Sequence, residues 1–153
     1  MTSMKILLAI VSSHRSVPAG AAGELVQDYL RRSTRYASCA LRMFATESKL
    51  LEFASDAATR TRPALLLADS RGKQLSSEEL ATAVGTLQDS GIQQLILAIG
   101  PADGWSAAAL DAASRVIAFG RITLPHELAA VVAAEQIYRA LTIRAGHPYH
   151  SGH

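Results

Sequence analysis

The chain has 153 residues, which matches the usual size of one domain and leaves little room for a second hydrophobic core. With 49% apolar and only 18% charged residues, it carries more hydrophobic surface than a monomer of this size requires, so we expect an oligomer. The net charge of +2 is compatible with RNA binding without arguing for it, and the single cysteine, Cys39, excludes an internal disulfide and a cysteine-rich zinc site and fits the reducing cytoplasm.

The first part of the chain alternates strand and helix patterns. Residues 4–11 form a short continuous apolar run, which is typical of a strand covered on both faces in a parallel sheet. Residues 20–34 place apolar side chains at helical spacing, and 38–44 form a moderately strand-like segment suited to a sheet edge. Residues 47–60 predict a further helix that is closed by Pro63.

The same alternation continues in the second part. Residues 64–68 and 94–99 are continuous apolar runs, and 115–119 form a shorter one. Between the first two, residues 76–90 predict a helix that opens with serine and glutamate at the spacing of a capping box. Strands and helices in alternation predict an α/β fold with a mostly parallel sheet flanked by helices.

The last predicted helix has the clearest limits. Pro125 suits a first helical turn, and no breaker interrupts residues 128–145 before Gly146. Residues 131–134 are apolar around nearly the whole circumference, which a helix exposed on one side would not tolerate. We therefore expect burial on two sides, in an arrangement that suits a position between subunits.

Glycine-containing segments follow three of the predicted strands. They cover residues 69–73, 100–104 and 120–124. In an open α/β sheet, ligands bind beyond the carboxyl ends of the strands, so these segments are expected to line one pocket of peptide groups. Taken singly, such a segment is more often only a tight turn.

Several common kinds of site are not indicated. The segment 11–15 lacks the glycine fingerprint of a dinucleotide fold, and neither a phosphate-binding GxxxxGK[ST] nor a hydrolase GxSxG motif occurs in the sequence. No HExxH or comparable spacing supports a metal site, so we expect no metal even though the C-terminal part is rich in histidine: His126, His147, His150 and His153.

Four stretches together resemble one known family. Residues 121–150, RITLPHELAAVVAAEQIYRALTIRAGHPYH, are similar to the C-terminal signature of the ribosomal RNA large-subunit methyltransferase H family, LPHxLxRVxxxEQxYRAxxIxxxxPYH. Residues 67–81 are similar to the family's LDxxGKxxSSExxA, 97–104 to its IGGxxG, and 29–36 also match. The four stretches occur in the family's order and cover nearly the whole chain.

This resemblance implies a SPOUT-type trefoil-knotted fold, with residues 1–153 as a single SPOUT methyltransferase domain in a homodimer that does not bind membranes. It also implies S-adenosyl-L-methionine as methyl donor and N3 of a pseudouridine in bacterial large-subunit (23S) ribosomal RNA, within the 70S ribosome, as the target. The family's cofactor contacts fall on Ala68, Gly100, Phe119, Gly120, Arg121, Ile122, Thr123 and Leu124. The side chains expected to place the RNA and handle its proton are His126, Glu135, Arg139, Tyr149 and His150.

Each of those five side chains also has a structural interpretation, as a helix brace, an ion pair or a packing group. The family's VGK is replaced here by Val-Ser-Ser at 11–13, its second glycine after the fourth strand by Pro101, and the arginine of LPHxLxR by Ala130. These departures leave two alternatives open: a catalytically impaired SPOUT protein that binds RNA or ribosomes, and a methyltransferase with another RNA target. Basic residues that could contact phosphate are Arg31, Arg32, Arg35, Arg71 and Lys73.

Overall fold

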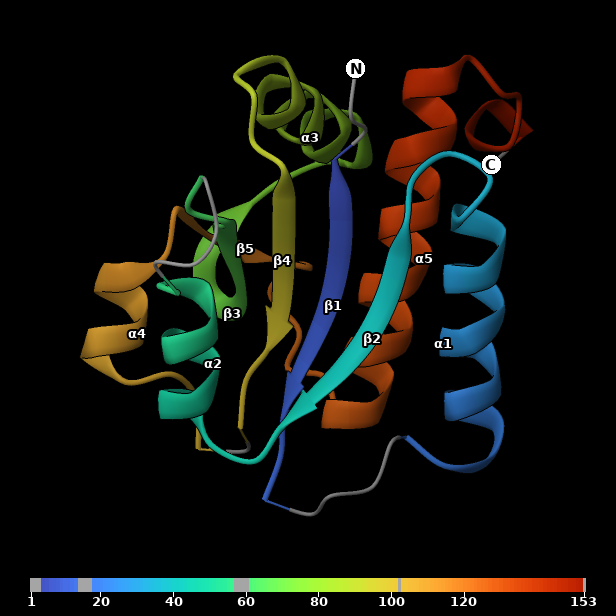
Figure 1. The fold of residues 1–153 in the computed structure, drawn as a ribbon. Helices are drawn as coiled ribbons and strands as arrows, with labels where there is room; N and C mark the ends of the chain where they lie inside the picture. The colour runs from blue at the N-terminus through green and yellow to red at the C-terminus, as the bar shows by residue number, and fades with distance from the viewer. Residues whose placement is uncertain (1–3, 14–17, 57–60, 102, 153) are drawn as a thin grey trace.

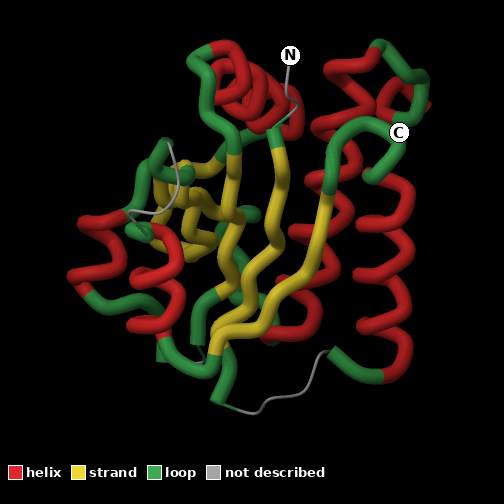
Figure 2. Tube along the Cα trace, viewed as in Figure 1, coloured by secondary structure: helices red, strands yellow, loops and turns green. Residues whose placement is uncertain are grey.

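Five parallel strands form one sheet in the part of the chain that the structure describes. The computed structural model describes residues 4–13, 18–56, 61–101 and 103–152. The strands lie in the order β2-β1-β4-β3-β5 (Figures 1 and 2). Their bounds are β1 Lys5–Val11, β2 Cys39–Phe44, β3 Ala64–Gln74, β4 Gln94–Ile99 and β5 Arg115–Ala118.

Helices cover both faces of the sheet. Helices α1, α3 and α5 lie on one face, where α5 contacts both α1 and α3, and helices α2 and α4 lie on the other (Figure 1). The helices are α1 Gly20–Ser33, α2 Glu47–Ala54, α3 Ser77–Asp89, α4 Ala107–Ala112 and α5 His126–Ala145, followed by a 3-10 turn, η1, at His150–Gly152.

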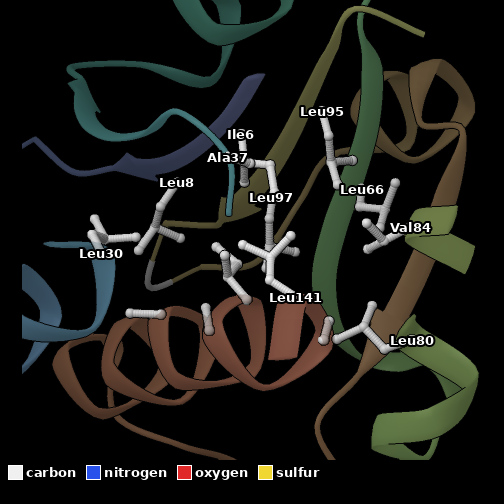
Figure 3. Packing of buried hydrophobic residues seen from close by; sticks show 14 of the residues in the cluster. Ile6, Leu8, Leu30, Ala37, Leu66, Leu80, Val84, Leu95, Leu97 and Leu141 are labelled. Atoms are coloured by element: carbon white, nitrogen blue, oxygen red, sulfur yellow. The ribbon is translucent and has the colours of Figure 1, made fainter. Parts of the chain in front are cut away.

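Alternate side chains of the central strands enter two separate cores. In β1, Leu8 and Ile10 have no exposed surface and face the helices α1, α3 and α5 (Figure 3 shows this cluster). Their neighbours Leu7 and Ala9 face α2 and α4 instead. Because both faces are covered, the strand can be apolar at every position, and this confirms the interpretation of the short apolar runs as strands of a parallel sheet.

The predicted position of residues 38–44 at the sheet edge is confirmed. β2 pairs only with β1, and exposed and half-buried residues alternate along most of its length. The predicted capping box is also present, because the Ser76 hydroxyl accepts from the backbone N–H of Glu79 and the Glu79 carboxylate accepts from that of Ser76. Helix α5 ends where expected, at Gly146, whose φ of 73° is in the left-handed region that favours glycine.

Three elements differ from the sequence-based expectation. β3 runs to Gln74, so residues 69–73, expected as a loop, belong to a strand whose pairing with β5 shifts register between Ala68 and Lys73. Helix α2 ends at Ala54, six residues before the predicted end at 60, and residues 57–60 lie outside the described part. The short helix α4 was not predicted, although Ser106 caps it with a side-chain hydrogen bond to Ala109 N–H.

The expected burial of the last helix is confirmed within a single chain. Helix α5 packs against the sheet, α1 and α3, and Ala130, Ala133 and Ala134 have no exposed surface. Small side chains along this face let the helix approach its neighbours closely. Among the described residues, no helix is both long and apolar enough to cross a membrane.

Candidate active site

A cleft of about 520 Å³ is lined by residues 68–71 of β3 and by the segments that follow β4 and β5. These strands are neighbours in the sheet, so their carboxyl ends meet at one edge, where an open α/β sheet binds ligands. All the residues expected to contact the cofactor line this cleft except Arg121, which is exposed but is not part of the lining. Residues 69–71 and the segments after β4 and β5 therefore converge on one cleft, as the sequence predicted, although residues 69–71 belong to β3 and are not a loop.

Trp105 lines the cleft, and the sequence analysis did not predict this role. Its side chain is 5% exposed, and its indole N–H donates to the carbonyl of Ala68 at 2.9 Å. The indole lies so close to Gly100 that a Cβ at that position would come within 2.7 Å of Trp105 Cε2. Glycine at position 100 is thus required by the packing of the tryptophan. The position of the chain's only tryptophan, directly after a glycine-rich segment, was an available signal.

The strand extension at residues 69–71 forms part of the cleft lining. The Asp69 carboxylate accepts from the Arg71 guanidinium at 2.9 and 2.8 Å and from the Arg71 backbone N–H at 2.8 Å. These hydrogen bonds hold the pKa of Asp69 below its usual value. Gly72 passes so close to β5 that a Cβ there would come within 2.7 Å of the Val116 carbonyl. The Arg71 guanidinium is therefore paired with a carboxylate of its own strand.

Another part of the lining carries one exposed apolar side chain and one buried nitrogen without a hydrogen-bond partner among the described residues. Ile122 lines the cleft with 75% of its surface exposed, which is unusual for a large apolar side chain. His126, at the first position of α5, also lines the cleft, and its Nε2 is buried without a hydrogen-bond partner among the described residues. An exposed apolar side chain beside an unpaired buried nitrogen is what a ligand would cover and satisfy.

Two residues that differ from the family's motif, Pro101 and Ala130, have different surroundings. Pro101 lines the cleft, supplies no backbone N–H to it, and accepts from Gly104 N–H at 2.9 Å. Ala130 lies in the core between α5 and the sheet with no exposed surface. Of the Val-Ser-Ser segment, Val11 is buried at the end of β1, and Ser12 N–H donates to Phe44.

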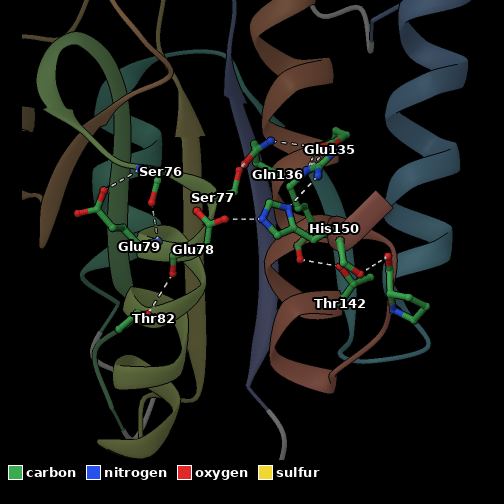
Figure 4. A network of polar contacts seen from close by, with 12 residues as sticks. Ser76, Ser77, Glu78, Glu79, Thr82, Glu135, Gln136, Thr142 and His150 are labelled. Atoms are coloured by element: carbon green, nitrogen blue, oxygen red, sulfur yellow. Dashed lines mark hydrogen bonds and ion pairs between the residues drawn. The ribbon is translucent and has the colours of Figure 1, made fainter. Parts of the chain in front are cut away.

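The other expected catalytic side chains form a second cluster, away from the cleft. Arg139 Nε donates to Glu135 at 2.9 Å, and its Nη1 lies 3.0 Å from His150 Nδ1 (Figure 4). The Arg139 guanidinium also lies over the Tyr149 ring, 4.9 Å from its centroid. Burial raises the pKa of Tyr149, so its phenol stays protonated at neutral pH. None of these four side chains is part of the cleft lining.

The length of α5 separates the two groups. His126 begins the helix and Arg139 lies thirteen residues further on, which is about 20 Å at the rise of an α-helix. Within one chain, the structure therefore brings His126 to the cleft and brings Glu135, Arg139, Tyr149 and His150 to each other, but it does not unite the two sets.

The candidate phosphate-binding arginines of α1 border the second cluster. Arg31 and Arg32 both form ion pairs with Asp28, at 2.7 and 2.9 Å. The Arg32 guanidinium also lies over the rings of Tyr29 and Tyr138, at 5.2 and 5.8 Å from their centroids. Lys73, in contrast, lines a different hollow beside α3. Among the described residues, no group of histidine, cysteine and acidic side chains is arranged to hold a metal ion.

The sequence matches a family model over almost its entire length. The model described as "Predicted SPOUT methyltransferase" covers residues 4–150. The chain belongs to the SPOUT methyltransferase family. Within this SPOUT family it is 50% identical, over 129 residues, to ribosomal RNA large subunit methyltransferase H of Koribacter versatilis, a match that covers 84% of this chain and 88% of that protein. This confirms the family resemblance found in the sequence.

Two further comparisons with SPOUT proteins cover a smaller share of the other protein. The protein of the same name from Mesorhizobium japonicum is 52% identical over 87 residues, which are 57% of this chain and 54% of that protein. The structure of the SpoU methyltransferase AviRb from Streptomyces viridochromogenes, in complex with AdoMet, aligns with a TM-score of 0.53 and 12% identity over 95% of this chain and 62% of that one. At this identity, the likeness confirms the fold alone.

Proposed function

We propose that this protein transfers a methyl group from S-adenosyl-L-methionine to large-subunit ribosomal RNA, at N3 of a pseudouridine. The observation that carries the proposal is the convergence of residues 68–71 of β3 and the segments after β4 and β5 on one cleft. The names of the relatives and the C-terminal motif support RNA of the large subunit as the substrate. We further propose that the activity belongs to a single knotted domain and is exercised on ribosomes in the cytoplasm.

The cleft suits S-adenosyl-L-methionine in size and chemistry. Its volume falls within the roughly 300–1,000 Å³ that is usual for drug-sized ligands. Phe119, Ile122 and Leu124 supply an apolar wall for the adenine ring, and peptide groups around Gly100 and Gly120 can hydrogen-bond its polar edge. Covering Ile122 would remove an exposed apolar surface from water.

The protein does not need to activate the methyl group itself. When bound, the cofactor supplies a sulfonium-activated methyl group that is ready for in-line transfer. The chain must therefore align the attacking N3 and remove its proton. We assign alignment beside the cleft to His126, whose buried Nε2 gains a partner when a polar group enters. Phosphate or base contacts fall to Arg139 and Tyr149, the latter as a protonated hydrogen-bond donor.

These roles require a second copy of the chain. Because about 20 Å of α5 separates His126 from Arg139, one chain cannot present both to the same RNA base. We propose a twofold dimer in which the C-terminal cluster of one protomer reaches the cleft of the other. Leu25 of α1 and Leu128 of α5, which are 45% and 51% exposed, provide apolar surface for such a contact.

A mixing experiment tests the composite site. His126→Ala and Arg139→Ala proteins, each inactive alone, should regain activity when they are unfolded and refolded together, because each mixed dimer then has one cleft with both native side chains. After statistical mixing, about half of the dimers are mixed, so about a quarter of all clefts should have both native side chains. Failure to regain activity, with mixed dimers demonstrated by mass spectrometry, would mean that the residues act within one chain.

The substrate is tested separately. The chain should bind S-adenosyl-L-methionine in a calorimetric titration and restore N3-methylpseudouridine in the 23S rRNA of a strain that lacks the family enzyme, as measured by nucleoside mass spectrometry. Cofactor binding without that modification would indicate another RNA target. Ribosome binding without cofactor binding would favour a protein that has lost catalysis, for which Pro101 in the cleft lining is the structural argument.

A further inference from the structure

Hydrogen bonds connect the second cluster into a closed circuit that returns to α3. Ser77 donates to Gln136 at 2.7 Å, and Gln136 donates to Glu135 at 3.0 Å. Glu135 accepts from Arg139, and Arg139 reaches His150. The other ring nitrogen of His150 lies 2.5 Å from Glu78, the residue after Ser77 (Figure 4). The circuit therefore ties the start of α3, the middle of α5 and the C-terminal tail together.

The donors and acceptors in this circuit determine the tautomer of His150. A guanidinium has only donors, so His150 Nδ1 must accept from Arg139 and carries no proton. The ring proton is then on Nε2 and is donated to the Glu78 carboxylate. A doubly protonated imidazolium would direct an N–H at the Arg139 N–H and place two cations in contact. In the contact between His150 and Glu78, the ring nitrogen Nε2 is thus the donor.

We propose that Glu78 is a positioning residue, which holds the C-terminal tail on α5 and keeps His150 as the Nε2–H tautomer with Nδ1 directed at Arg139. The inference rests on the proposed function, in which the tail acts at the cleft of the partner protomer. Glu78 itself does not approach the cleft in its own chain, since it lies at the start of α3 and is not part of the cleft lining.

The opposite end of the circuit fixes Arg139. Glu135 accepts from Arg139 Nε at 2.9 and 3.3 Å, and both side chains are about 15% exposed. Gln136 and Ser77 in turn hold Glu135, so the guanidinium has a set orientation toward His150 and the Tyr149 ring. Tyr149 also packs edge-on against Tyr138 of α5, 4.8 Å between centroids, which anchors the tail a second time.

Glu78 contributes orientation rather than stability. Its side chain is 63% exposed, and hydrogen bonds made at such a surface add little to the free energy of folding. The bond from His150 nevertheless keeps the pKa of Glu78 below its usual value, so the acceptor stays ionised. Glu79, its exposed neighbour, contributes stability instead, because it completes the capping box of α3.

Glu78→Ala, Glu78→Gln and Glu79→Ala separate these roles. The ring nitrogens of His150 are observed by ¹⁵N NMR of the full-length protein, with assignment from a His150→Asn variant. Wild type should show the Nε2–H tautomer, and Glu78→Ala should show a mixture of tautomers, because a ring that Glu78 no longer holds can turn away from Arg139. Glu78→Gln, which keeps an oxygen acceptor, should restore the wild-type pattern. Glu79→Ala should lower the melting temperature more than Glu78→Ala does and leave the tautomer unchanged.

The same variants are compared as enzymes. By analogy with the hydrogen-bond partners of metal-ligating histidines, whose loss typically costs tenfold or more, kcat for RNA methylation should fall about tenfold in Glu78→Ala, with unchanged binding of S-adenosylhomocysteine. An unchanged tautomer in Glu78→Ala, or loss of activity that Glu78→Gln does not rescue, overturns the inference. If wild type does not methylate RNA, the proposed function fails, and the NMR comparison still decides the role of Glu78.

Discussion

The packing of Trp105 on Gly100 predicts a strong energetic coupling between the two positions. In Gly100→Ala, the new Cβ would lie 2.7, 2.9 and 3.1 Å from three indole atoms, whereas ordinary contact begins at 3.4 Å. The indole must therefore shift, which costs about 1–3 kcal/mol as overpacking and weakens its hydrogen bond to Ala68, worth about 1 kcal/mol. Reduced chain entropy of the unfolded state offsets part of this, since alanine replaces glycine. We expect a net loss of about 2 kcal/mol.

The same substitution should cost almost nothing in a Trp105→Phe background. The two atoms that the Cβ would overlap most, Cε2 and Nε1, belong to the indole N–H edge, which phenylalanine lacks, and the hydrogen bond to Ala68 is already gone. A double-mutant cycle should therefore give a coupling free energy of about 2 kcal/mol between positions 100 and 105.

Urea unfolding followed by far-UV circular dichroism measures the cycle, because the phenylalanine variants have no tryptophan fluorescence. Equal destabilisation by Gly100→Ala in both backgrounds would refute the reasoning, since it would mean that the indole is not what requires glycine there. A titration of the four proteins with S-adenosylhomocysteine then shows whether the shift of the indole also narrows the cleft. We expect weaker binding in Gly100→Ala and recovery in the double variant.

Three further predictions concern other parts of the fold. Gly72→Ala should destabilise the protein by about 2 kcal/mol or more in urea unfolding, because its Cβ would meet the backbone of Val116, which cannot rotate away. Ser76→Ala should cost about 1 kcal/mol in the same assay through loss of the α3 cap, and an unchanged midpoint would contradict this. Burial raises the pKa of Cys39 from 9.0 to about 11, so its thiolate forms only at high pH. Its alkylation rate should still rise at pH 10, and a plateau below pH 9 would be inconsistent with burial.

The strands and long helices were predictable because their signals are local. A run such as residues 94–99 is apolar at every position only when both faces of a strand are covered, and β4 has the predicted bounds. The capping box of α3 and the glycine end of α5 are likewise recognised within a few residues. Helix α4 was missed because six residues show little periodicity, and only Ser106 marks its start.

The cleft was predictable in position but not in construction. Strand order decides which carboxyl ends meet, and the family resemblance supplied the residues that line the cleft. What the sequence did not indicate are contacts between segments far apart in the chain: the indole of Trp105 against Gly100 and Ala68, and the return of Gly72 to β5. These depend on how closely two backbones approach, which is a property of the packed structure alone.

The division of the expected catalytic residues into two groups also becomes visible only in the packed structure. In the sequence, His126 and Arg139 belong to one continuous motif, and nothing in that motif says how far apart its functions lie. Once the segment is a straight helix buried against the sheet, the spacing becomes a distance of about 20 Å, too long for one reaction centre. Both ends of such a helix can therefore contribute to the same kind of active site only if each end contributes to the site of a different protomer. From this distance alone, without the relatives' names, we expect activity from a dimer and none from a monomer.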